Sequence, residues 1–95
     1  LRAVLHLETY LRLVRRLGDT RCEQELLQSV SNCYRTLGNL DYALSYQEQR
    51  LQVLLQLQQR DQFLAALAEF ERLCQRAGCC ARLVPYRAIG DTEVD

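Results

Sequence analysis

The sequence contains no lysine, so all twelve of its basic residues are arginines, and these balance twelve acidic residues to a net charge of zero. A surface that binds nucleic acid needs a basic excess, which usually appears as a pI above about 9. The pI of this chain is about 6.8. The composition therefore excludes a general nucleic-acid binder, and every positive charge that could recognise a partner is a guanidinium.

Long apolar runs are also missing. The longest covers residues 63–68, whereas a membrane-spanning helix needs roughly 20 apolar residues, so no membrane span is expected. No basic lead, apolar run and small-residue cleavage site opens the chain, which argues against a signal peptide. The five cysteines are irregularly spaced and odd in number, unlike a disulfide framework. We expect a reduced, cytoplasmic protein, and the initial Leu1 leads us to expect a piece of a longer one.

Few residues in the sequence could support catalysis or metal binding. His6 is the only histidine, so a Cys–His nucleophile would have to use it, and helical periodicity leaves it without a partner in sequence. Cys74, Cys79 and Cys80 do not form a CxxC pair, the spacing that zinc sites commonly use. We therefore expect no enzyme, no catalytic residue, no metal and no cofactor.

Prolines and glycines are few, one and four respectively, and the intervening stretches are rich in good helix formers. Gly18, Gly38 and Gly78 are spaced at multiples of 20 residues, and a glycine after a helix accepts the positive φ that its end requires. The sequence predicts an all-α fold with helices near residues 2–17, 20–37, 40–58 and 60–77. The expected caps are Asp19 or Thr20 for the second helix and Asn39 or Asp41 for the third.

Apolar residues at helical spacing predict the buried faces of these helices. The second helix offers Leu27, Val30, Tyr34 and Leu37, and the fourth offers residues 67, 70, 74 and 77. The length suits one domain, which we place at residues 1–84. Because Pro85 interrupts the last apolar segment, residues 85–95 are predicted to form an irregular tail.

The chain repeats itself at a shift of 40 residues. The shift aligns Ala3 with Ala43, Leu11 with Leu51, Val14 with Leu54, Leu27 with Leu67, and Gly38 with Gly78. A fixed period between 20 and 50 residues is typical of proteins whose helical units stack, because one hairpin cannot bury its apolar face alone.

The spaced residues of one unit resemble the tetratricopeptide repeat. They are Leu27, Val30, Ser31, Tyr34, Gly38, Ala43 and Leu51. Residues 31–39 and 47–51 are similar to the 40-residue repeats of the LGN/Pins and rapsyn-type proteins, and the likeness covers residues 1–78. The resemblance implies antiparallel hairpins stacked as a short α-solenoid. It also implies a non-catalytic scaffold or adaptor that holds an extended peptide of a partner protein.

In such stacks the first helix of each repeat lines the concave face. The resemblance therefore implies a peptide-binding set, which consists of Gln28, Asn32, Arg35, Thr36, Arg72, Gln75 and Arg76. Since arginine grips carboxylates bidentately, we expect an acidic peptide. The alternative interpretation is a solvated helix face on which Glu69 and Glu71 neutralise these arginines.

Two further interpretations remain open at this stage. Leu5, Leu13 and Leu55 are surplus to a single apolar stripe, which would suit self-assembly as a homo-oligomer or packing against further repeats. Residues 92–95 resemble the Glu-Glu-Val-Asp tail that some tetratricopeptide domains bind, although a solvated fragment end explains them more simply.

Overall fold

The computed structural model describes residues 2–78 and 80–92, and these residues are helical throughout apart from the turns. The elements are α1 (Arg2–Leu17), α2 (Thr20–Thr36), α3 (Leu40–Gln56), α4 (Arg60–Ala77), a 3-10 turn η1 (Cys80–Leu83) and α5 (Val84–Thr92). The expected all-α fold is confirmed for the described part of the chain. No helix there is both long and apolar enough to cross a membrane.

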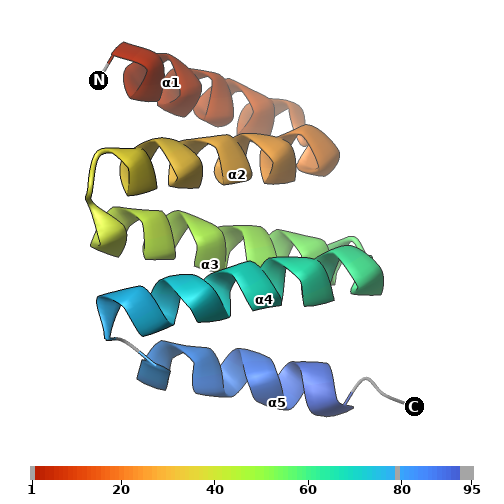
Figure 1. The fold of residues 1–95 in the computed structure, drawn as a ribbon. Helices are drawn as coiled ribbons and strands as arrows, with labels where there is room; N and C mark the ends of the chain where they lie inside the picture. The colour runs from red at the N-terminus through yellow and green to blue at the C-terminus, as the bar shows by residue number, and fades with distance from the viewer. Residues whose placement is uncertain (1, 79, 93–95) are drawn as a thin grey trace.

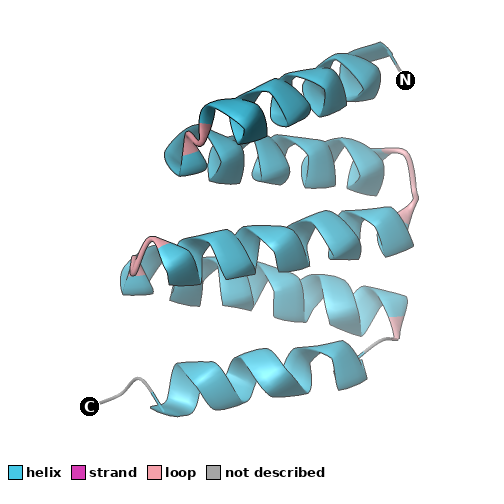
Figure 2. Cartoon of the chain, turned by 180° about the vertical axis from the view of Figure 1, so that it is seen from behind, coloured by secondary structure: helices cyan, strands magenta, loops and turns pink. Residues whose placement is uncertain are grey.

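The helices follow one another through the molecule in sequence order, each running back along its predecessor, with α1 at one end and α5 at the other (Figure 1). The same order is seen from behind (Figure 2). Backbone contacts join α1 to α2, α2 to α3, α3 to α4, and α4 to η1 and α5. The result is a slab of 41 × 31 × 15 Å.

The first two turns are built alike. Gly18 and Gly38 adopt left-handed φ values of 73° and 84°, which an L side chain would resist. In each turn the glycine and the next residue donate backbone hydrogen bonds to the end of the preceding helix, as in a Schellman cap. That next residue, Asp19 or Asn39, then caps the following helix by accepting from the amide of Cys22 or Tyr42 at 3.2 Å. The glycine and cap predictions are confirmed.

The third turn has the same backbone conformation but different residues. Gln58 lies at φ 56°, the position that glycine holds 20 and 40 residues earlier. Gln59 precedes α4 but accepts no side-chain hydrogen bond from it. The chain therefore bears a strained left-handed residue and an uncapped helix at this turn.

Replacing Gln58 by Gly and Gln59 by Asn should stabilise the protein. The glycine relieves the left-handed strain, although it also adds entropy to the unfolded chain, and the asparagine supplies a new cap. Together these effects should raise the free energy of unfolding by about 1–2 kcal/mol. Urea denaturation would measure the gain. Gln56→Gly, at the last residue of α3 and two residues earlier, is the matched control and should lower stability. A Gly-Asn variant no more stable than wild type would contradict this view of the turn.

The largest core cluster joins α3, α4 and η1. Its fully buried members include Leu44, Leu51, Leu54, Phe70 and Cys74. A smaller cluster, in which Leu11 and Leu27 meet Val53, ties α1 and α2 to α3. The predicted stripe of α2 is correct for Leu27 and Val30 but wrong for Leu37, which is 54% exposed because the helix has already ended there.

The predicted irregular tail is wrong for the residues that the structure describes. Val84–Thr92 forms α5, in which Pro85 occupies the first turn, where its missing N–H would have had no helical acceptor. Tyr86 and Ile89, three residues apart, pack on the main core cluster. The helical region therefore continues past residue 84, and residues 93–95 of the expected tail lie outside the described part. Helices α2 and α3 end at Thr36 and Gln56, slightly before the predicted 37 and 58.

Candidate functional site: a groove between α2 and α4

A groove of about 410 Å³ runs between α2 and α4, with α3 beneath it. Helix α2 contributes Gln28, Ser31, Asn32 and Arg35, helix α4 contributes Glu69, Arg72, Leu73 and Arg76, and Gln47 comes from α3. The residues from α2 and α4 recur at intervals of three or four, so each helix presents one continuous stripe to the groove.

The groove brings together most of the residues predicted to bind a peptide. Gln28, Asn32, Arg35, Arg72 and Arg76 all line it. Thr36 and Gln75 do not line it. The Thr36 hydroxyl donates back to the carbonyl of Asn32 at 2.9 Å, and Gln75 is exposed elsewhere on α4. A rotation of about 100° per residue carries both side chains off the stripes that their neighbours occupy.

The arginines of the groove are not neutralised by nearby carboxylates. Glu71 pairs with Arg87 of α5 at 2.6 Å, and Glu69 is engaged by residues of α3. Within the described residues, no ion pair involves Arg35, Arg72 or Arg76. The two acids that the solvated-face interpretation relied on therefore contact other residues, and three guanidinium groups line the groove without an ion-pair partner among the described residues.

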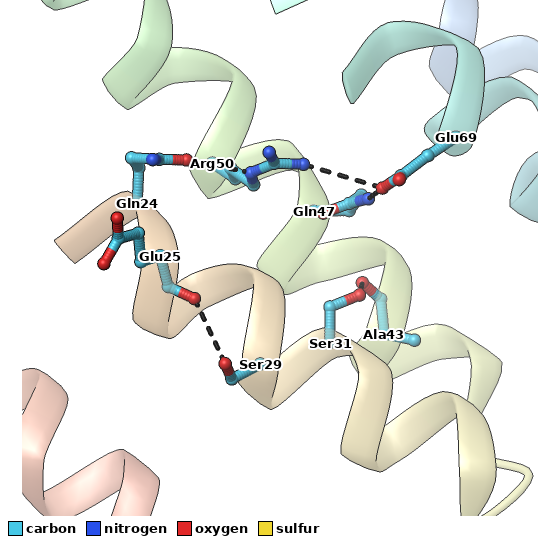
Figure 3. A network of polar contacts seen from close by, with 8 residues as sticks. All are labelled: Gln24, Glu25, Ser29, Ser31, Ala43, Gln47, Arg50 and Glu69. Atoms are coloured by element: carbon cyan, nitrogen blue, oxygen red, sulfur yellow. Dashed lines mark hydrogen bonds and ion pairs between the residues drawn. The ribbon is translucent and has the colours of Figure 1, made fainter. Parts of the chain in front are cut away.

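A polar network forms the floor of the groove (Figure 3). Gln47, which is 4% exposed, donates to Glu69 at 3.1 Å. Arg50 of α3 donates to Gln24 of α2 at 3.1 Å and lies 3.6 Å from Glu69. Burial lowers the pKa of Arg50, while Glu69 acts in the opposite direction. The side-chain oxygen of Gln47, Oε1, is buried and has no hydrogen-bond partner among the described residues.

Close packing of α2 against α3 positions the wall of the groove that α2 forms. Ser31 and Ala43 are both buried at the crossing, where the Ser31 hydroxyl donates to the Ala43 carbonyl at 2.8 Å. The small side chains allow this close approach. It brings Gln47 beside the α2 stripe. The predicted set lacked four lining residues, Ser31, Gln47, Glu69 and Leu73. Gln47 belongs to the second helix of a hairpin, which the resemblance did not place at the groove. The other three depend on how α2 and α4 are rotated.

A second network holds the other side of the slab. Glu8 of α1 accepts hydrogen bonds from the hydroxyls of Tyr34 on α2 and Tyr46 on α3. The two rings stack with centroids 5.7 Å apart. Burial, then the neighbouring Glu8, raises the pKa of Tyr34, and for Tyr46 burial followed by its hydrogen bond to Glu8 has the same effect. Both tyrosines therefore remain neutral donors at physiological pH and tie three helices together.

Cys22 and Cys33 are free thiols, Cys79 lies outside the described residues, and the side chain of Cys80 is likewise not described. Among residues 2–78 and 80–92, no three His, Cys, Asp or Glu side chains are grouped to hold a metal ion. Comparisons with protein-family models, curated proteins and solved structures find no match to this chain.

Proposed function

We propose that the chain is a non-catalytic protein-interaction module that binds an extended acidic peptide of a partner protein in the groove between α2 and α4. The observation that carries this proposal is the set of three arginines, Arg35, Arg72 and Arg76, which converge on one groove without ion-pair partners among the described residues. Each guanidinium presents a planar fork that matches a carboxylate.

The other lining residues suit a peptide backbone. Asn32 and Gln28 line the groove, and each offers donors and an acceptor. Leu73 supplies an apolar contact beside them. An extended strand presents N–H and C=O groups along its length and side chains to alternate sides, so amide and arginine groups can be used together.

The proposed architecture is a short solenoid of tetratricopeptide-type hairpins. In this interpretation α2 and α4 are the first helices of successive repeats, and α1, α3 and α5 are second helices. The recurrence of the turns at 20-residue intervals, the 40-residue sequence period and the packing order of the helices support it. We place such an adaptor in the cytoplasm, in keeping with the free thiols of Cys22 and Cys33.

A selection experiment tests the proposal without a known ligand. Random peptides of about eight residues, which span roughly the 25 Å length of α2 when extended, would be displayed and selected on the wild-type chain. Sequences enriched in Asp and Glu are expected. Arg72→Glu/Arg76→Glu should bind the selected peptides at least ~10-fold more weakly, equivalent to about 1.4 kcal/mol.

The matched control is Arg21→Glu/Arg60→Glu, which changes the net charge equally. Neither residue lines the groove, and each lies in the first turn of its helix, where an acid is favourable. This variant should retain the affinity of wild type. Selection without acidic enrichment, or equal weakening by both double variants, would reject the groove as the binding site.

A further inference from the structure

Helix α1 leaves an apolar stripe open at one end of the molecule. Tyr10, Leu13 and Leu17 are 54%, 55% and 73% exposed, and the exposed His6 continues the stripe one turn earlier. The spacing from His6 to Leu17 follows one face of the helix. The opposite face packs on α2 through Val4, Leu11 and Val14.

The 40-residue period gives the equivalent positions on α3, where the corresponding stripe is covered. The counterparts on α3 are Tyr46, Arg50, Val53 and Leu57. All four are buried or half-buried, and Val53 is only 7% exposed where Leu13 is 55% exposed.

Helix α2 supplies much of that cover. Its Tyr34 stacks on Tyr46, its Gln24 accepts from Arg50, and its Leu27 packs in one cluster with Val53. The stripe on α1 therefore has the shape of a surface against which another helix packs.

Charge identifies the kind of helix that fits. Arg12 and Arg16 flank the stripe in a shallow hollow with Tyr10 and Leu13, and neither arginine has an ion-pair partner within the described residues. The one acidic residue of α1, Glu8, turns away to Tyr34 and Tyr46. The open face is thus apolar with a basic border.

We propose that this face of α1 is the docking site for an acidic amphipathic helix of a partner protein, which packs on Tyr10, Leu13 and Leu17 as α2 packs on α3. A second copy of the chain is a poorer occupant. Two α1 faces related by a two-fold axis would bring their Arg12 and Arg16 side chains together at one interface, and like charges repel there. The site is separate from the groove and uses none of its residues.

The probe is a fluorescein-labelled peptide of residues 20–36, the helix that covers the equivalent stripe on α3, with Arg21→Glu and Arg35→Glu to make it acidic. We expect saturable binding to the full chain by fluorescence anisotropy, weakened by added salt. Leu13→Asp should reduce the affinity at least ~10-fold. Arg12→Glu/Arg16→Glu should also reduce it, without removing any apolar contact.

Two controls separate this site from other surfaces. Leu37→Asp places the same substitution at a leucine of similar exposure outside α1 and should leave binding unchanged. Arg72→Glu/Arg76→Glu should also leave binding of the probe unchanged. If the groove held the acidic probe, this variant would lose binding. Absence of binding, or binding insensitive to Leu13→Asp, would overturn the proposal. So would a dimer in sedimentation equilibrium that Leu13→Asp dissociates, because the occupant would then be a second copy.

Discussion

Phe70→Ala should lower the free energy of unfolding by about 3–5 kcal/mol, the range for truncating a fully buried phenylalanine. Phe70 has no exposed surface and belongs to the cluster that joins α3, α4 and η1. Its ring meets that of Tyr86 edge to face at 5.7 Å, so the truncation also removes an aromatic pair that holds α5. At roughly 4–8 °C per kcal/mol for a domain of this size, the melting temperature should fall by at least ~12 °C.

Urea denaturation and thermal melting followed by circular dichroism would measure this loss. The comparison variant is Tyr86→Ala, which removes the same ring contact and the weak hydrogen bond from Gln52. Because Tyr86 is only half-buried, its truncation should cost clearly less than that of Phe70. Equal losses would mean that the stability of this end depends on docking of α5 rather than on filling the core, and would contradict the prediction for Phe70.

Ala43→Leu should destabilise the protein by about 2–3 kcal/mol, because it forces a larger side chain into a packed crossing. Ala43 has no exposed surface, and its carbonyl accepts the hydrogen bond from Ser31 on the facing helix. No space remains for three added carbons unless α2 and α3 move apart. That movement would displace Asn32 and Arg35 relative to Arg72 and Arg76, so the proposed binding of an acidic peptide should weaken together with stability.

Ser31→Ala is the control for this crossing. It removes the hydrogen bond at 2.8 Å but adds no volume, so the expected loss is only about 1 kcal/mol. Denaturant melts of both variants, with peptide binding measured well below each midpoint, would separate the two effects. Ala43→Leu with wild-type stability would show that the helices are not held by close approach at this point.

Local features of the sequence determined the helices and most of the turns. A left-handed residue after a helix and a short oxygen before the next one act within a few residues, so Gly18, Gly38, Asp19 and Asn39 could be placed correctly without knowing the fold. Gln58 shows the limit of this reasoning. It adopts the same conformation with an unsuitable side chain, because the helices on both sides of the turn are already fixed by packing.

The prediction for the C-terminal region was wrong for a related reason. Pro85 can end a helix or begin one, and the sequence alone does not distinguish the two roles. Burial of Tyr86 and Ile89 against α4 and the rest of the main cluster decided in favour of α5. A short helix of this kind gains its stability from contacts with distant residues rather than from its own propensity.

The sequence by itself determined the all-helical fold, because helical periodicity is a local property. The resemblance to stacked helical repeats implied the candidate binding residues, five of which line the groove. Only the tertiary structure decided which charges in the groove are compensated. Arg50 and Arg87, distant in sequence, engage Glu69 and Glu71 and so leave Arg35, Arg72 and Arg76 without partners among the described residues. Ion pairing depends on which helices meet and at what rotation, so a net charge of zero could become a locally basic groove only through the packing of α3, α4 and α5.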